Sequence, residues 1–390
     1  MNYRERAREL AGWMISLRRD IHLHPELSFH EERTGQIAAS LLEEWGFQVR
    51  RAAGTGIAAF LPGRGEKTVA VRADMDALPI QEETGLDFAS SRPGVMHACG
   101  HDLHVACALG AARMLSEKNR EEGLGGGVLL LLQPAEEINR GAGAMIRDGV
   151  LDDRPVDMIF GLHNHPFYPA GTVVLREGAF MAAVDTLKIT IRGTGSHGAM
   201  PHRSADPILA AASVIMNLQS VVSRNVDPQE AAVVSFGTLS GGTADNVIPG
   251  EVVMTGTMRS FSREVRELVH GRVQSVSEHA AAGLGCCAEV EIRRDLPVVL
   301  NDSAAYRHCL RAAREIVGEE GVLSGTPSMG GEDFSLFQER IPGCLFWLGV
   351  GNPSLGAVHP WHSPRFTADE SAIHIGAAIL AMAAQLALPN

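Results

Sequence analysis

Residues 127–137 read GVLLLLQPAEE, an apolar run followed by the adjacent acids Glu136 and Glu137. A short apolar run beside turn residues predicts a buried strand. Residues 139–148 then have a helical pattern, so the two acids are expected between the end of a strand and the start of a helix. In open α/β sheets this is the edge at which ligands bind.

The same alternation continues on both sides of this stretch. Helical patterns cover residues 1–21, 32–45, 101–116, 302–317 and 369–386, and short apolar runs cover 57–61, 68–72, 158–161 and 344–349. Strands that alternate with helices predict an α/β fold, with a sheet covered by helices.

A different pattern interrupts this alternation. Strand, helix, strand, strand, helix and strand patterns follow at 185–192, 206–222, 231–239, 251–259, 262–282 and 287–293. This βαββαβ order is typical of a ferredoxin-like unit. A chain of 390 residues also exceeds the roughly 250–300 residues at which single cores stop growing. We therefore expect a discontinuous domain of residues 1–184 and 294–390, with a second domain, 185–293, inserted into it.

Charge and cysteine usage limit the class of protein. The net charge is −12 without a basic run, which argues against nucleic-acid partners. Charged residues interrupt the first twenty positions, so no signal peptide is expected. The apolar stretch 373–388 falls short of the ~20 residues of a membrane span, and we expect an amphipathic helix there and no membrane association. Six cysteines without a disulfide-framework spacing predict reduced thiols and a cytoplasmic location.

Residues 96–104, MHACGHDLH, place one thiol, three imidazoles and a carboxylate within nine positions. A lone histidine is more often structural than a ligand, but packing does not require such a concentration, which favours a metal site. The adjacent carboxylates of Glu136 and Glu137 repel one another unless a cation or a proton neutralises them. A helix N-terminus that favours acids is the alternative. Beside a metal, one acid could bind it while the other transfers protons.

A third element, RADMDALP at 72–79, sets two acids after a predicted strand. Asp76 is a candidate to accept the free ring N–H of a metal-binding histidine, as supporting carboxylates do. A surface turn is the alternative.

Together these motifs resemble the M20 metallopeptidase superfamily, and above all its amidohydrolase branch of hippurate hydrolases, N-acyl-amino-acid amidohydrolases and auxin-conjugate hydrolases. The resemblance runs in order along nearly the whole chain. It rests on HLHPE at 22–26, RADMDALP, CGHDLH at 99–104, QPAEE at 133–137, GSHGAMPH at 195–202, GEDF at 331–334 and HSP at 362–364. It implies a zinc-exopeptidase-like catalytic domain with an inserted lid and dimerisation domain.

The resemblance implies a site with two divalent metal ions. The ligands would be Cys99, His101, Glu137, His163 and His362, with the Cys99 thiolate bridging the ions. Zn suits this donor set, and Mn, Co or Ni are compatible. Glu136 would be the general base that takes a proton from metal-activated water. The reaction would cleave the amide bond of an N-acyl amino acid to a carboxylic acid and a free amino acid.

The resemblance also implies roles for the inserted domain. His197 would contact the oxyanion, from its own subunit or from a partner, and Asn246 and Arg259 would bind substrate. An arginine suits the α-carboxylate because its planar fork makes two charge-assisted hydrogen bonds. For each of the three, a local structural task is the alternative. We expect a homodimer or a higher homo-oligomer.

Two features have no assigned role in this pattern. Trp361 precedes His362 where Leu or His is frequent in the family, and it can shape the acyl pocket. His104 and His165 lie near the predicted ligands in sequence, and either a supporting or a purely structural task fits them.

Three other readings compete with the amidohydrolase. Cys99 could be a nucleophile activated by His101, as in thiol amidases, but then the paired glutamates, His163 and His362 lack a purpose. A metal-stabilised binding protein would not need Glu136. Within the superfamily, a dipeptidase or carboxypeptidase shares the mechanism and differs in the group on the acyl side.

Overall fold

The computed structural model describes residues 1–389, which divide into two compact units. Unit 1 consists of the described residues in 1–178, 300–326 and 332–389. Unit 2 consists of Ala179–Val299 and Pro327–Gly331.

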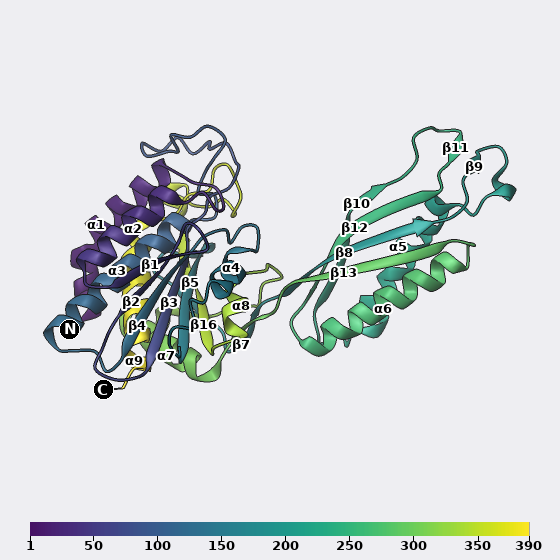
Figure 1. Cartoon of the computed structure of the whole chain (residues 1–390). Helices are drawn as coiled ribbons and strands as arrows, with labels where there is room; N and C mark the ends of the chain where they lie inside the picture. The colour runs from purple at the N-terminus through teal and green to yellow at the C-terminus, as the bar shows by residue number, and fades with distance from the viewer. Residues whose placement is uncertain (390) are drawn as a thin grey trace. The chain divides into compact units, whose positions relative to one another are not determined.

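A large mixed sheet of eight strands forms the centre of unit 1 (Figure 1). Its order is β1-β2-β4-β3-β5-β16-β6-β15, and the neighbours β4, β3, β5 and β16 run parallel. Every residue of β3 and β4 is buried, which explains why these strands appear in the sequence as continuous apolar runs. The strands are β1 (Gln48–Ala52), β2 (Gly56–Leu61), β3 (Thr68–Asp74), β4 (Gly127–Gln133), β5 (Met158–Pro169), β6 (Val173–Leu175), β15 (Val322–Ser324) and β16 (Gly343–Gly351).

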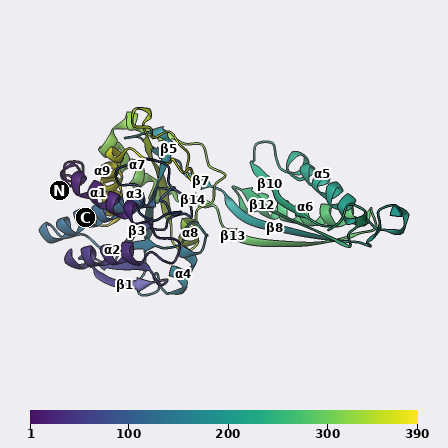
Figure 2. The same cartoon turned by 90° about the horizontal axis from the view of Figure 1, so that it is seen from above.

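Helices cover both faces of this sheet (Figures 1 and 2). Helices α1, α3 and α9 pack against one another, α7 packs on α9, and α4 packs against α8. Their bounds are α1 (Tyr3–Leu23), α2 (Glu32–Glu44), α3 (His101–Glu121), α4 (Gly141–Arg147), α7 (Ser303–Val317), α8 (Phe334–Gln338) and α9 (Ile373–Ala387). Unit 1 therefore has the mixed α/β fold with a central sheet that the sequence predicted.

One described segment, Glu370–Ala387, is long and apolar enough to cross a membrane by length and hydropathy alone. Of this segment, 56% is buried inside the protein, and its helix α9 packs on α1, α3 and α7. A buried core helix accounts for the same composition.

Local structure departs from the sequence prediction next to the acidic pair. The helix expected at 139–148 is the shorter α4, because Ala135 and Asn139 adopt positive φ angles of 53° and 56° and hold the intervening chain in a turn. Glu136 and Glu137 therefore lie on an irregular loop. By contrast, α3 continues to Glu121, beyond the predicted end at residue 116.

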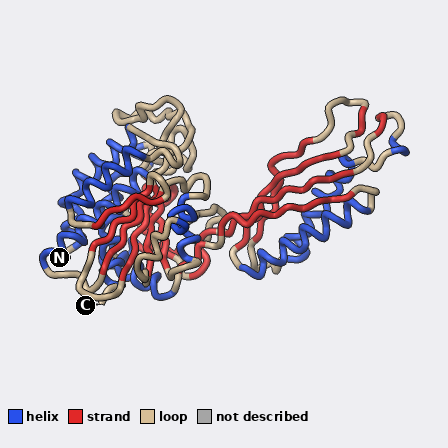
Figure 3. The backbone as a smooth tube through the Cα atoms, viewed as in Figure 1, coloured by secondary structure: helices blue, strands red, loops and turns tan. Residues whose placement is uncertain are grey.

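Unit 2 contains an antiparallel sheet of four strands in the order β10-β12-β8-β13, with α5 and α6 packed against each other and against the sheet (Figure 3). Alternate residues of β8, Leu187, Ile189 and Ile191, are fully buried in its core. The elements are β8 (Ala183–Arg192), α5 (Pro207–Asn225), β10 (Ala232–Ser240), β12 (Glu251–Ser260), α6 (Arg263–Ala282) and β13 (Cys287–Leu296). The short strands are β7 (Gly178–Met181), β9 (Ser196–His197), β11 (Val247–Ile248) and β14 (Val299–Asn301).

Candidate metal centre

The five predicted metal ligands come from distant parts of the chain and meet in unit 1. Cys99 and His101 lie at the start of α3, Glu137 follows β4, His163 lies on β5, and His362 precedes α9. Because β3, β4 and β5 are parallel, their carboxyl ends share one edge of the sheet. The ligand atoms form two groups that share Cys99, one with His101 and His163 and one with Glu137 and His362, and within each group they lie within 4.8 Å of one another.

Two separations match the spacing of ligands on one metal ion. Cys99 Sγ lies 3.6 Å from His163 Nε2, and His362 Nε2 lies 3.4 Å from Glu137 Oε2. A tetrahedral zinc ion, with bonds of about 2.3 Å to sulfur and about 2.0–2.1 Å to nitrogen or oxygen, sets such pairs about 3.5 Å and 3.4 Å apart. The donor set therefore fits divalent metal ions.

Buried polar atoms in this cluster lack ordinary partners. His101 Nε2 and Glu137 Oε1 are buried without a hydrogen bond, an arrangement that costs about 1–3 kcal/mol for each unpaired group. Burial raises the pKa of Glu137 to about 7, and burial followed by the Glu137 charge raises the pKa of the Cys99 thiol. A cation would stabilise both anionic forms and satisfy the unpaired atoms, which supports the same conclusion.

Asp76 supports this cluster from the end of β3. Its carboxylate accepts the backbone N–H groups of Glu136 and Glu137 at 3.1 Å each, and His101 Nδ1 lies 3.3 Å from it. Burial alone would raise the pKa of Asp76, but the hydrogen bond and the charge of His101 lower it below its ordinary value. An ionised Asp76 holds the proton of His101 on Nδ1 and leaves Nε2 free to bind a metal.

The Glu136 carboxylate adjoins the ligands. Its Oε2 lies 4.0 Å from His101 Nε2, and it forms a buried acidic group with Glu332 and Asp333. Burial, and then the charges of Glu332 and Asp333, raise the pKa of Glu136 well above its usual value. A carboxylate with a raised pKa suits proton transfer near neutral pH.

A fully buried arginine, Arg72, holds this acidic group together. Its guanidinium donates to Asp74 at 2.7 Å, to Glu332 at 2.9 Å and to Asp333 at 3.0 Å. RADMDALP and GEDF are recognisable motifs in the sequence, but their pairing was not predicted. The two motifs together contain one basic residue, Arg72, and several acids. Because a buried arginine requires carboxylate partners, this imbalance could have indicated the pairing.

The two histidines without an assigned role differ in their surroundings. His104 is fully buried, with Nδ1 2.6 Å from Asp74 Oδ1, so it supports the centre from behind. His165 lies among aromatic rings, with centroids 4.6 Å from Trp361 and 4.7 Å from Trp347. Burial lowers the pKa of His165 to about 4, which favours a neutral packing residue.

His22, the first residue of the HLHPE motif at 22–26, anchors α1 to the start of α3. His22 Nδ1 lies 2.8 Å from Asp102 Oδ2, and Arg18 Nε lies 2.6 Å from the same oxygen. Although burial opposes ionisation, Arg18 and His22 hold the pKa of Asp102 far below its ordinary value. This buried ion group fixes the helix end that carries His101.

The three residues predicted to contact substrate lie in unit 2. His197 and Asn246 are both exposed. They lie close together, since Gly198, the residue after His197, donates its N–H to the Asn246 carbonyl at 2.7 Å. Asn246 precedes the start of β12, whereas Arg259 is half-buried near the end of this strand, where it pairs with Val184 at the start of β8. Burial lowers the pKa of Arg259, and among residues 1–389 its guanidinium forms no hydrogen bond or ion pair.

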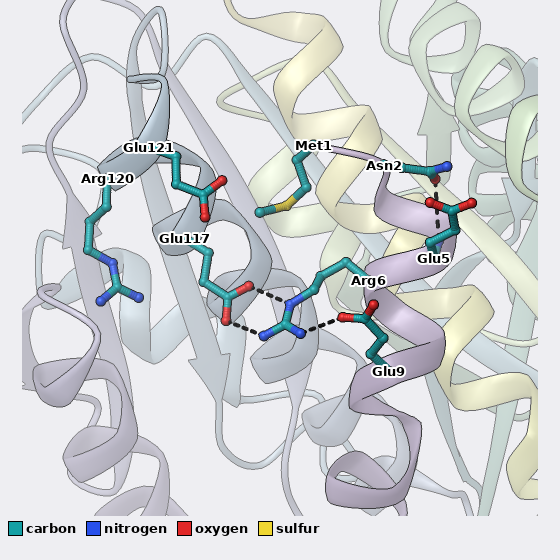
Figure 4. Close-up of a pocket in the computed structure, with 8 residues that line it drawn as sticks. All are labelled: Met1, Asn2, Glu5, Arg6, Glu9, Glu117, Arg120 and Glu121. Carbon is teal, nitrogen blue, oxygen red and sulfur yellow. Dashed lines mark hydrogen bonds and ion pairs between the residues drawn. The ribbon is translucent and has the colours of Figure 1, made fainter.

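A cavity of about 670 Å³ lies elsewhere in unit 1, between α1 and the end of α3 (Figure 4). Arg6 crosses it to Glu117 at 2.8 Å and pairs with Glu9 at 2.6 Å. Glu117 lies more than four helical turns beyond His101, about 24 Å along the helix axis. This cavity is therefore separate from the metal cluster. Its lining residues are Met1, Asn2, Glu5, Arg6, Glu9, Glu117, Arg120 and Glu121.

Comparisons with known proteins identify relatives of the whole chain. A family model described as peptidase family M20/M25/M40 matches residues 70–386. An N-acetylcysteine deacetylase of Bacillus subtilis (strain 168) is 43% identical over 380 residues, covering 96% of this chain and 97% of the relative. Thermostable carboxypeptidase 1 of Saccharolobus solfataricus is 38% identical over 376 residues, covering 95% and 94%. A Bacillus subtilis structure described as a dinuclear metal-binding peptidase of the M20 family superposes with a TM-score of 0.86 at 39% identity, covering 98% and 99% of the two chains.

Proposed function

This chain belongs to peptidase family M20/M25/M40 and is a hydrolase, and we propose that it cleaves the amide bond of N-acyl amino acids. The observation that carries the proposal is the pair of ligand groups sharing Cys99, with the Glu136 carboxylate beside them. The deacetylase relative, which the chain matches over nearly its whole length, supports an acyl amino acid as substrate.

The candidate ligands for two divalent ions are Cys99, His101, Glu137, His163 and His362. When bound, such ions supply a Lewis acid for the amide carbonyl and lower the pKa of water from 15.7 to about 7. Zn is the first choice for this donor set, and Mn, Co or Ni fit it as well.

Glu136 moves the protons in the proposed reaction. Its carboxylate accepts a proton from the attacking water and delivers it to the nitrogen of the departing amino acid. The acyl carbon gains a bond to oxygen and loses its bond to nitrogen, so a carboxylic acid and a free amine result. Glu332 and Asp333 help Glu136 to hold this proton, because their charges disfavour its ionised form.

Unit 2 is proposed to be a ferredoxin-like lid, and the larger part of the chain a zinc-exopeptidase-like catalytic domain. Ala199 donates its N–H to His197 Nδ1 at 3.0 Å, so a neutral His197 carries its proton on Nε2, where it can donate to the developing oxyanion. Arg259, with its unpaired and half-buried guanidinium, is proposed to bind the substrate carboxylate. Asn246 is proposed to contribute a further polar contact.

One lid cannot bring His197 and Arg259 to the same small substrate. The β12 residues Glu251 and Arg259 are separated by about 26 Å at about 3.3 Å per residue, and β9, which carries His197, lies beyond the Glu251 end. We therefore propose that His197 acts on the site of a partner subunit.

The surface of unit 2 offers a place for that partner. The edge strand β10 and residues 231–244 around it carry no charged side chain, and Arg224 is the one charge on α5. Exposed apolar side chains lie on both elements, with Leu209 57%, Met216 72% and Leu239 52% exposed. The opposite edge, β13, is protected by charges such as Glu289 and Glu291. A second copy of this chain on the β10 and α5 edge would bury the apolar side chains and complete the strand pairing.

Subunit mixing tests both proposals together. Glu136→Gln and His197→Ala subunits are each expected to be nearly inactive alone. If His197 acts across the dimer, a mixed dimer contains one intact site, and mixing restores up to about a quarter of the wild-type activity. If mixing restores nothing while dimers exchange, His197 acts within its own subunit. Leu239→Lys should yield monomers in sedimentation, whereas Glu291→Lys on the other edge should not.

A thiol amidase fits the structure less well. Cys99 is buried, and its raised pKa keeps the thiol protonated in the absence of a cation, whereas a nucleophilic cysteine needs a lowered pKa. A carboxypeptidase or dipeptidase remains the second candidate, and the Saccharolobus relative favours it. The cytoplasmic location stays a prediction, to which the six free cysteines add support.

The decisive assay uses protein stripped by a chelator and reloaded with Zn, Mn, Co or Ni one at a time. Release of free amino acid is measured from N-acetyl and N-benzoyl amino acids and from dipeptides. Metal-dependent cleavage of the acyl amino acids supports the proposal. A preference for dipeptides moves the protein to the peptidase side, and no cleavage with any metal contradicts both.

A further inference from the structure

Asn164, a residue outside every predicted role, lies at the centre of the contacts behind the ligands. It follows His163 on β5 and is fully buried. Its carboxamide Nδ2 lies 2.5 Å from the carbonyl oxygen of Cys99 and 2.8 Å from His104 Nε2. Its Oδ1 accepts the indole N–H of Trp361 at 3.3 Å. One side chain thus contacts the segment before α3, the helix α3 and the segment before His362.

The orientation of this carboxamide follows from its partners. A reversed amide would place Oδ1 2.5 Å from the Cys99 carbonyl oxygen and would turn an N–H toward the N–H of Trp361. Both contacts would be repulsive, so Nδ2 faces Cys99 and Oδ1 faces Trp361.

The protonation of His104 is fixed by the same residue. The backbone N–H of Asn164 can only donate, and it lies 2.8 Å from His104 Nε2, so that nitrogen is an acceptor. His104 therefore carries its proton on Nδ1 and donates it to Asp74, which Arg72 holds in turn. Asn164 is joined in this way to a fully buried ion group of unit 1.

The ligand side chains are set by these contacts. His163 Nδ1 lies 2.8 Å from the Asn164 carbonyl oxygen, to which it donates, and this leaves Nε2 facing Cys99 Sγ. Gly100 adopts a φ of 83°, and a Cβ there would lie 2.4 Å from Asn164 Nδ2, so the turn between Cys99 and His101 closes directly over the amide. His362, at the positive φ of 63°, is held by its N–H to the Ala98 carbonyl at 2.9 Å.

We propose that Asn164 is the positioning residue of the metal centre: its carboxamide ties the Cys99 turn to His104 and Trp361 and thereby holds Cys99 Sγ at ligand spacing from His163 Nε2, whose ring is fixed by the backbone carbonyl of Asn164. The inference rests on the proposed function, because it assumes that these two atoms bind metal. Asn164 itself does not bind the metal. Its carboxamide acts through the bond to the Cys99 carbonyl, and its backbone carbonyl, which side-chain variants keep, fixes the ring of His163.

The test compares Asn164→Ala and Asn164→Asp with a matched control, Asn301→Ala. Asn301 is also buried, and its Nδ2 bridges the carbonyl oxygens of Arg176 and Leu345, away from the centre. Metal affinity is measured by competition with a chromophoric chelator. Cobalt-loaded protein is measured for its thiolate-to-metal charge-transfer band, which reports the Cys99–metal bond.

Both Asn164 variants are expected to lose about 10- to 100-fold in metal affinity and to show a weakened or shifted charge-transfer band. Asn301→Ala should lower the melting temperature and leave affinity and band unchanged. Trp361→Phe, which removes the indole N–H and makes the aromatic side chain smaller, should change affinity only a few-fold. If Asn164→Ala does not fold, Asn164→Asp carries the test, since it keeps the shape and removes the donor.

Wild-type affinity and an unchanged cobalt spectrum in the Asn164 variants would overturn the inference. Failure of the proposed function is distinguishable from this result, because the wild-type protein itself would then bind no metal pair or cleave no acyl amino acid.

Discussion

The metal cluster of unit 1 and the predicted substrate residues of unit 2 are built in opposite ways. In unit 1 the candidate ligands are packed together, and Asp76, Arg72 and Asn164 fix their orientation from behind. In unit 2 His197 and Asn246 are exposed, and Arg259 lies at the other end of the sheet. The difference agrees with the proposal that unit 1 holds the metal ligands and the general base, whereas the groups of unit 2 act only when another surface meets them.

The largest expected effect is removal of the shared ligand in unit 1. Cys99→Ala should abolish hydrolysis and lose bound metal, because Cys99 belongs to both ligand groups. Metal content per chain is measured by mass spectrometry after dialysis. The control is Cys344→Ala, which removes a buried thiol of β16 outside these groups and should keep both metals. Two tightly bound ions in Cys99→Ala would mean that the ligand set is wrong.

The next effect separates chemistry from metal binding within the same cluster. Glu136→Gln should lower kcat by about 10²- to 10⁴-fold, the usual contribution of a general base, while the metal content stays at the wild-type value. Steady-state kinetics and metal analysis of the same sample decide this. Glu117→Gln at the far end of α3 should behave like wild type. Near-normal turnover of Glu136→Gln would refute its role as the base.

A smaller effect is expected from Asp76, which orients a candidate ligand of unit 1; the exposed residues His197 and Asn246 of unit 2 have no comparable supporting residue in the described part of the chain. Asp76→Asn should weaken metal binding by about 10- to 100-fold, because the amide cannot accept both the backbone N–H groups and the His101 proton. Chelator competition measures the affinity. Asp157→Asn, which loses a similar acceptor for the Thr68 N–H before β3, should leave it unchanged. Equal affinities for the two variants would show that Asp76 has no special link to the metals.

The smallest effect concerns recognition by unit 2. Arg259→Ala should raise KM by about 10- to 100-fold for substrates with a free carboxylate, since a charge-assisted hydrogen bond contributes about 1.5–3 kcal/mol. For the matching carboxamide substrates KM should hardly change. Arg293→Ala, an exposed arginine of the same unit, serves as the control. A KM increase of equal size for acid and amide substrates would exclude a contact between Arg259 and the carboxylate.

Much of the site in unit 1 could be predicted because several of its residues lie within short sequence motifs. Apolar runs before Glu136 and Asp76 placed these residues after predicted strands, and the parallel sheet brings such strand ends together. Cys99 was found through the concentration of ligand residue types at 96–104, before a predicted helix. The family resemblance supplied His163 and His362, which no local pattern joins to the others. The predicted start of helix α4 was wrong. Ala135 and Asn139 adopt positive φ angles, and neither is a glycine, the residue type that would have indicated such a turn.

The supporting residues could not be predicted in the same way. Arg72 meets Glu332 and Asp333 only after 260 residues of intervening chain have folded, and nothing near Asn164 in sequence indicates the Cys99 carbonyl as its partner. Contacts of this kind depend on which strands are neighbours in the sheet. For unit 2, strand and helix patterns were enough to predict the elements, whereas the roles of His197, Asn246 and Arg259 stay proposals.

The most direct test of the account is a titration of metal-free protein with zinc while release of amino acid from an N-acetyl amino acid is measured. We expect hydrolysis to be absent without metal and to reach its maximum at about two equivalents of zinc per chain, as two ligand groups sharing one thiolate require. Once the protein is loaded, alkylating reagents should not inactivate it. Full activity without metal, together with inactivation by alkylation of Cys99, would contradict the account and restore the thiol nucleophile.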